Sequence, residues 1–164
     1  MVDGAAGAVG AWANDRADQE ELQWLGHTRL RVLADSARTG EQVTVIEENC
    51  GAGDCSPLHV HHHEDEMFWL LEGAMSAWVD GERHDLEAGG FAFLPRGIPH
   101  AYRFTADNSR ALLIATPAGV EDMFREAGWD LAAPAPEGWS VSMPLLAQIC
   151  ERRGTPIVGP PPED

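Results

Sequence analysis

The stretch SPLHVHHHEDEMFWLLEG (residues 56–73) places four histidines and three consecutive acidic residues directly before an apolar, aromatic run. Successive side chains of a β-strand alternate between its faces, so His59 and His61 point the same way, and Glu66 opens the apolar strand that follows. Burying two imidazoles and a carboxylate without partners costs several kcal/mol each. A divalent cation satisfies all three groups, because neutral imidazole nitrogen and carboxylate oxygen are both good ligands of first-row metals.

A fourth candidate ligand lies downstream, in GGFAFLPRGIPHAYRF (residues 89–104). The segment begins with glycines, continues as an alternating apolar run and reaches His100 through a Pro-Arg-Gly turn. We expect this second strand to bring His100 opposite the first cluster. Three histidines and one glutamate leave positions open on a metal that prefers five or six ligands, which is typical of a catalytic site.

The rest of the chain predicts an all-β fold. Residues 42–48 alternate and are rich in β-branched side chains, and Asp80-Gly81 stands between two alternating runs, as in a tight hairpin. Short strands punctuated by glycine and proline, without intervening helices, favour an antiparallel barrel or sandwich. After Pro117 the apolar spacing becomes helical, with a stop at Gly128, and a second short helix is predicted from near Pro144 to Gly154.

These patterns predict a single domain with three parts, over the whole range 1–164. Residues 1–22 are small, acidic and aperiodic, and we interpret them as a flexible N-terminal arm. Residues 23–118 form the β-barrel, and residues 119–164 form a helical C-terminal extension. A chain of 164 residues is long enough to bury a real core.

Composition limits the partners of the chain. The net charge of −16 repels a phosphate backbone, so nucleic acid is not expected as a partner. All 11 basic residues are arginines, which excludes Schiff-base chemistry on lysine. The start carries no basic leader and no apolar run approaches the ~20 residues of a membrane span, so we expect a cytoplasmic protein without membrane contact. Cys50 and Cys55 are close enough in sequence to pair, but free thiols in a reducing cytosol are the favoured interpretation.

The two histidine segments resemble the two motifs of the cupin family. The first motif, G-x5-H-x-H-x4-E-x6-G, and the second, G-x5-P-x-G-x2-H, both fit without a mismatch. Phe104 replaces the asparagine that usually follows, a departure that does not touch the ligands. The matching residues are Gly53, His59, His61, Glu66, Gly73, Gly89, Pro95, Gly97 and His100.

This resemblance implies a small double-stranded β-helix, or jelly-roll, barrel with two short C-terminal helices and one divalent transition metal inside. By family analogy the metal is nickel, manganese, cobalt, iron, copper or zinc. The flanking segments look like those of bacterial quercetin 2,3-dioxygenase-like monocupins, which implies a dioxygenase acting on a flavonol or a related small aromatic or enolic compound. Glu66 would then bind the metal and accept the proton of the substrate hydroxyl, helped by desolvation that raises its pKa.

Two other interpretations stay open. One is a non-oxidative enzyme on the same scaffold, a polyketide cyclase, isomerase or decarboxylase that uses the metal as a Lewis acid. The other is a non-catalytic module that binds or senses a small molecule. No helix-turn-helix segment accompanies the barrel, which disfavours a transcription factor.

The remaining residues of the two segments receive weaker assignments. His62 and His63 are interpreted as solvated turn residues, and Glu64 as a turn residue that replaces Glu66 only if the strand register slips. Phe68, Leu70 and Tyr102 share a face with the ligands and are candidates for the substrate pocket. Met67, Trp69 and Leu71 point the other way, toward a second sheet or a subunit interface. Because cupins often dimerise, a homodimer is expected.

Overall fold

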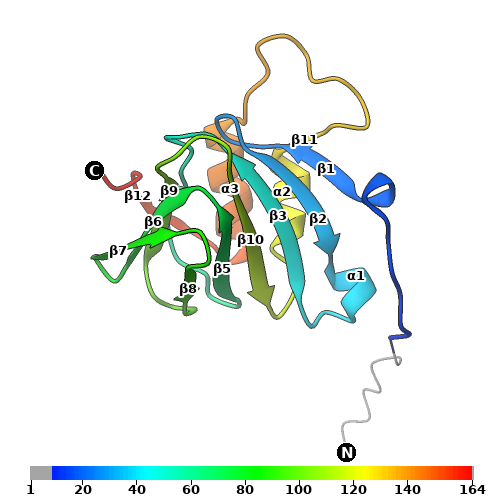
Figure 1. Ribbon diagram of the computed structural model, residues 1–164, viewed down its shortest axis with the longest axis horizontal. Helices are drawn as coiled ribbons and strands as arrows, with labels where there is room; N and C mark the ends of the chain where they lie inside the picture. Colours follow the sequence, from blue (N-terminus) through cyan, green and yellow to red (C-terminus); the bar gives the residue numbers. More distant parts are fainter. Residues whose placement is uncertain (1–8, 164) are drawn as a thin grey trace, which may run out of the picture.

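Two antiparallel β-sheets wrap around a common core in the computed structural model, which describes residues 9–163 (Figure 1). The larger sheet has seven strands in the order β11-β1-β2-β3-β10-β5-β8. The antiparallel all-β architecture predicted from the strand pattern, and the jelly-roll barrel implied by the family resemblance, are therefore confirmed. The strands of this sheet are β1 (Glu20–Gln23), β2 (Arg29–Ala34), β3 (Thr44–Cys50), β5 (Asp65–Glu72), β8 (Phe91–Leu94), β10 (Ser109–Thr116) and β11 (Trp129–Asp130).

The smaller sheet has five strands in the order β12-β4-β9-β6-β7. The hairpin predicted at Asp80-Gly81 joins β6 to β7, and both turn residues have positive φ angles, 52° and 80°. Glycine adopts this backbone conformation without strain, which favours a tight turn of this kind. The strands of this sheet are β4 (Leu58–His59), β6 (Ala74–Val79), β7 (Glu82–Glu87), β9 (His100–Phe104) and β12 (Ile157–Gly159).

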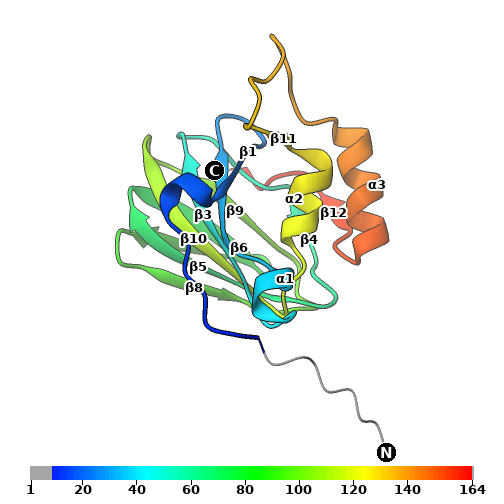
Figure 2. The ribbon, with the colours of Figure 1, turned by 90° about the vertical axis from the view of Figure 1, so that its right-hand side faces the viewer.

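The two predicted C-terminal helices are α2 (Glu121–Ala127) and α3 (Met143–Arg153). The side chain of Ser142 caps α3 by accepting a hydrogen bond from the backbone N–H of Leu145, and Gly154 ends it in the left-handed conformation. Figure 2 shows both helices packed side by side, on the opposite side of the barrel from β5 and β8. Two further short helices are η1 (Arg16–Asp18), which precedes β1, and α1 (Ser36–Thr39), which lies between β2 and β3.

A buried carboxylate fastens α2 to the larger sheet. Glu121 is fully buried, and it accepts hydrogen bonds from the backbone N–H of Ser36 at 2.7 Å and of Gly119 at 3.0 Å. The hydroxyl of Thr44, on β3, donates a further hydrogen bond to it. These donors satisfy both oxygens, so the charge is stabilised although it lies away from water.

The structure shifts two of the expected boundaries. Strand β1 begins at Glu20 and pairs with β2, so the sheet includes the end of the segment interpreted as an arm. Its first eight residues lie outside the described part, and the flexibility of the arm stays a prediction. The C-terminal extension is not purely helical, because β11 and β12 add a strand to the edge of each sheet.

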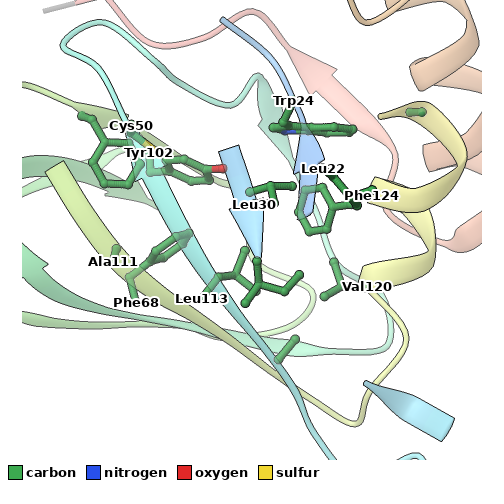
Figure 3. Packing of buried hydrophobic residues seen from close by; sticks show 14 of the residues in the cluster. Leu22, Trp24, Leu30, Cys50, Phe68, Tyr102, Ala111, Leu113, Val120 and Phe124 are labelled. Atoms are coloured by element: carbon green, nitrogen blue, oxygen red, sulfur yellow. The ribbon is translucent and has the colours of Figure 1, made fainter. Parts of the chain in front are cut away.

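The core lies between the sheets and continues under α2 (Figure 3). Phe68 and Leu113 come from adjacent strands of the larger sheet, Leu30 from β2 and Phe124 from α2, and each is at most 3% exposed. The edge of Phe124 packs against Trp24, with ring centroids 4.7 Å apart. Among the described residues, no helix is long and apolar enough to cross a membrane.

The outer face of the larger sheet carries large apolar side chains. Trp69 on β5 and Phe91 on β8 are directly paired, as are Met67 and Phe93. Trp69, Phe91 and Phe93 are 48%, 58% and 53% exposed, whereas Phe68, between Met67 and Trp69, is fully buried. Residues 67 and 69 therefore point away from the core, as the strand alternation predicts.

Candidate metal centre

The four predicted ligands converge inside the barrel. His59 on β4 and His100 on β9 are paired across the smaller sheet, and Glu66 on β5 reaches them from the larger sheet. One donor atom from each of these three residues and from His61 lies within 4.8 Å of the others. All four side chains are buried, with at most 8% exposure. Residues separated by up to 41 positions thus form one compact cluster.

Each imidazole is held by its Nδ1 atom. His59 Nδ1 lies 2.9 Å from the carbonyl oxygen of Pro57, and His100 Nδ1 lies 2.9 Å from that of Ile98. His61 Nδ1 is 3.3 Å from a carboxylate oxygen of Glu64. All three partners are acceptors, so each Nδ1 carries the proton and each Nε2 keeps its lone pair. This is the tautomer that a histidine needs to bind a metal through Nε2.

Two buried polar atoms at the centre of the cluster lack hydrogen-bond partners. His100 Nε2 and Glu66 Oε2 are 3.3 Å apart, and His61 Nε2 is 3.7 Å from Glu66 Oε1. Within the described part of the chain, neither His100 Nε2 nor Glu66 Oε2 has a hydrogen-bond partner of good geometry, although both atoms are buried. Orphaned buried polar atoms are rare. A divalent cation at this point would satisfy both of them, so the residues fit a metal.

Burial and mutual contact shift the pKa values of the cluster. Burial lowers the pKa of His59 to about 3, so this imidazole is neutral. Burial alone also lowers the pKa of His61, but the hydrogen bond to Glu64 and the charge of Glu66 outweigh it and raise that pKa. For Glu66, burial raises the pKa, yet the three adjacent imidazoles lower it to about 2. The expected rise in the pKa of Glu66 is therefore wrong, because the imidazoles overcome desolvation.

A cavity of about 40 Å³ adjoins the cluster. His59, His61 and Glu66 line one side of it, and the remaining wall is mostly apolar. Residues of both α2 and α3 contribute to this wall. The apolar lining includes Trp24, Met123, Phe124, Leu146, Cys150 and Ile157.

Of the three residues predicted to line the pocket, the structure places one at the cavity and two in the core. Tyr102 lines the cavity. Phe68 and Leu70 do not line it, because each lies farther along β5 than Glu66 and is fully buried in the core. His62 and His63 are exposed, in agreement with the turn interpretation.

Tyr102 contacts a second buried carboxylate that the sequence reasoning missed. Glu48 on β3 is fully buried, and the Tyr102 hydroxyl donates a long hydrogen bond of 3.5 Å to its Oε1 atom. Burial, reinforced by the charges of Glu66 and Asp54, raises the pKa of Glu48 to about 8. The carboxyl group with the raised pKa is therefore Glu48.

Two signals in the sequence point to the missed residues. Glu48 is two positions from Ile46 in an alternating strand, so the period-two pattern places an acid on the inner face. Glu64 follows His61 by three residues, which suits a turn that folds a carboxylate back onto the imidazole. The cavity residues of α3 carry no comparable signal, because helix docking depends on tertiary packing. No disulfide bond joins Cys50 to Cys55, both of which are described.

The sequence comparisons place this architecture in a known family. Residues 48–117 match the family described as "Cupin domain". With its jelly-roll fold and its two ligand motifs, the chain belongs to the cupin superfamily. It is 30% identical over 113 residues to quercetin 2,3-dioxygenase of Bacillus subtilis, an alignment that covers 69% of this chain and 34% of that enzyme. The chain spans 34% and 50% of the lengths of two curated relatives that it matches.

Solved structures confirm the fold. An RmlC-like cupin from Shewanella frigidimarina superposes with a TM-score of 0.60 at 17% identity, covering 69% of this chain and 96% of that one. KdgF from Halomonas sp. gives the same TM-score at 14% identity, covering 68% of this chain and 99% of that one. At such identities the likeness concerns the fold alone.

Proposed function

We propose that this chain is a metal-dependent dioxygenase that cleaves a small aromatic or enolic compound, in the manner of quercetin 2,3-dioxygenase. The observation that carries the proposal is the convergence of His59, His61, Glu66 and His100 beside an apolar cavity. The similarity to quercetin 2,3-dioxygenase of Bacillus subtilis supports the choice of reaction. A cytoplasmic location, expected from the sequence, belongs to the same proposal.

The four cluster residues would hold one divalent metal, with nickel, manganese, cobalt, iron, copper and zinc all compatible with nitrogen and oxygen ligands. When bound, such an ion would act as a Lewis acid and stabilise the anion of an enolic substrate. The chain itself would supply the rest. Glu66 is ionised and would accept the proton of the substrate hydroxyl, although its pKa of about 2 makes it a weaker base than the raised pKa expected from the sequence. The apolar wall would exclude water from the cavity.

The volume of the cavity limits the size of the ligand that it can hold. Ligand pockets commonly measure ~300–1,000 Å³, whereas this cavity measures about 40 Å³. A flavonol therefore requires the covering helices to move, while a compound of one small ring requires a smaller displacement. We accordingly place small enolic and phenolic compounds before flavonols in order of expected turnover.

Elemental analysis combined with an oxygen-electrode screen tests the proposal. Purified protein loaded with each metal in turn would be mixed with flavonols, catechols and small enols, and oxygen uptake would be recorded. Uptake that stops after chelation supports the dioxygenase. Product formation without oxygen uptake would identify the non-oxidative cupin enzyme instead, and ligand binding without any product would identify a binding module.

The dual role of Glu66 has its own test. Glu66→Gln keeps one oxygen ligand but loses the proton acceptor, so we expect the metal to bind more weakly and turnover to fall by about 100-fold or more. Metal content measured beside turnover separates the two contributions. Full activity in a variant that retains its metal would refute the role of Glu66 as a base.

We also propose that the chain forms a homodimer through the outer face of β5 and β8. Trp69, Phe91 and Phe93 form an exposed apolar patch on a protein whose net charge is −16, so two copies that meet through these side chains would bury apolar surface without placing charged side chains against each other at these positions. Light scattering of the Phe91→Glu variant tests it. A wild-type dimer that becomes a monomer supports the interface, and an unchanged mass contradicts it.

A further inference from the structure

Glu48 is a buried carboxyl group without the partners that such a group normally has. Its Oε2 atom has no hydrogen-bond partner among the described residues, and Oε1 receives only the hydroxyl of Tyr102. The charged groups that act most strongly on it are Glu66 and Asp54, both acidic. A buried carboxyl group in such surroundings costs several kcal/mol relative to an apolar residue of the same size.

Other buried carboxylates of the chain have structural explanations. Glu121 accepts hydrogen bonds from two backbone N–H groups and a hydroxyl, and it fastens a helix to the sheet. Glu66 belongs to the histidine cluster. Among the described residues, the one hydrogen bond of the Glu48 carboxyl group is with the phenol on the cavity wall. The contact with Tyr102 is therefore the interaction that explains why a carboxyl group is buried at position 48.

The direction of that hydrogen bond follows from chemistry. An ionised carboxylate is only an acceptor, so Tyr102 donates to it. When Glu48 is protonated with its proton on Oε2, the atom that has no other partner, Oε1 remains a carbonyl-like acceptor for the phenol. In these two states the phenol proton points toward Glu48. The lone pairs of the phenol oxygen are left for the cavity, which Tyr102 lines together with His59 and Glu66.

We propose that Glu48 is a positioning residue of this site, which holds the Tyr102 hydroxyl proton so that the phenol oxygen accepts a hydrogen bond from a hydroxyl group of the ligand. This inference rests on the proposed function, because it assumes that a small oxygen-bearing ligand binds beside the histidine cluster. It adds a requirement on the ligand class. The preferred ligand carries a free hydroxyl group next to the oxygen that approaches the metal ligands, as catechols and enediols do.

The single tyrosine of the chain allows a test without metal or substrate. Protein grown with [13Cζ]tyrosine gives one labelled resonance, which reports the hydrogen bonding of Tyr102 alone. Glu48→Met removes the acceptor at nearly constant size, and we expect it to shift this resonance in the metal-free protein. Glu47→Met is the matched control, since Glu47 is adjacent on β3 but ion-pairs with Arg16 and Arg110 instead. A shift no larger than that of the control would overturn the inference.

A second measurement tests the ligand class. Metal-loaded protein is titrated with catechol and with 2-methoxyphenol, which lacks one hydroxyl, and the ratio of their dissociation constants is determined calorimetrically. Loss of metal chelation by the methylated compound affects every variant equally. We expect the preference for catechol to fall about 5- to 10-fold in both Tyr102→Phe and Glu48→Met, the value of one hydrogen bond. Glu47→Met should keep the wild-type ratio.

The remaining outcomes are also decisive. A preference that falls in Tyr102→Phe but not in Glu48→Met would assign the contact to Tyr102 alone and overturn the role of Glu48. Should Glu48→Met not fold, Glu48→Gln retains a carbonyl acceptor and should keep the catechol preference, and its loss there would contradict the inference. A screen without oxygen uptake would defeat the dioxygenase proposal but leave both measurements valid.

Discussion

Two buried carboxyl groups of one barrel interior have pKa values shifted in opposite directions. Glu66 and Glu48 are both almost fully buried, on strands of the same sheet. Burial raises the pKa of each, but three imidazoles surround Glu66 and lower its pKa to about 2, whereas the pKa of Glu48 rises to about 8. Burial alone therefore does not fix the charge of a carboxyl group in this barrel.

The difference assigns distinct chemistry to the two regions. The region around Glu66 presents an ionised oxygen and imidazole lone pairs, which attract a cation. The region around Glu48 contains a phenol and a carboxyl group that holds its proton near neutral pH, which suits the recognition of a neutral hydroxyl. A ligand between them would meet a charged side and a hydrogen-bonding side.

Removing one imidazole should have the largest effect. His100→Ala removes one of the imidazoles beside Glu66 and one ligand from the cluster, so we expect metal affinity to fall by about 100-fold or more. Metal content after dialysis, determined by elemental analysis, provides the measurement. The exposed His63 gives a matched control, and His63→Ala should retain wild-type metal content. Equal retention by both variants would show that the cluster is not the metal site.

A structural carboxylate should give the next largest effect. Glu121→Gln turns one acceptor into a donor that faces other donors, and we expect a loss of about 3 kcal/mol in the free energy of unfolding at pH 7. Because hydrogen bonds lower the pKa of Glu121, its contribution exists above the ordinary pKa of a glutamate and disappears as the pH falls. Denaturant titrations at pH 7 and pH 4 measure both. Asp122→Asn, on the same helix, should cost less than about 1 kcal/mol.

Glu48 should show the opposite pH dependence. Its pKa is about 8 in the folded protein and near 4.5 when unfolded, so between these values the folded state binds the extra proton and wild-type stability falls as the pH rises. Glu48→Gln abolishes this loss. In metal-free protein we expect the variant to gain about 2–3 kcal/mol over wild type between pH 5 and pH 7.5, measured by denaturant titration. Parallel stability curves for the two proteins would mean that Glu48 is ionised throughout.

The metal-ligand cluster could be predicted from the sequence, whereas the role of Glu48 largely could not. His59, His61 and His100 stand at fixed spacings beside glycine turns, and strand alternation brings them to one face. A carboxylate in an apolar strand has no such spacing rule. The role of Glu48 depends on Tyr102, which is 54 residues away in the sequence. Only the packing of the two sheets against each other brings the two side chains together.

The same reasoning explains the errors at the pocket. Alternation places Phe68 and Leu70 on the inner face correctly, but it does not say how deep along the strand the cavity extends. The helices end the cavity near Glu66, and their docking depends on packing between Phe124 and Trp24, which no local pattern specifies.

The smallest expected effect concerns Glu64, which is not one of the four cluster residues but contacts the imidazole of His61. Its carboxylate lies 3.3 Å from His61 Nδ1 and is the one acidic partner among the three imidazole Nδ1 contacts, since the other two are backbone carbonyls. Glu64→Gln keeps an acceptor but removes the charge that makes His61 a stronger base, so we expect metal affinity to fall by about 10-fold, with all four ligands intact. A competition titration with a chromogenic chelator measures this change. An affinity loss as large as that of His100→Ala would indicate that Glu64 itself binds the metal, and no loss would indicate that orientation by hydrogen bonding alone suffices.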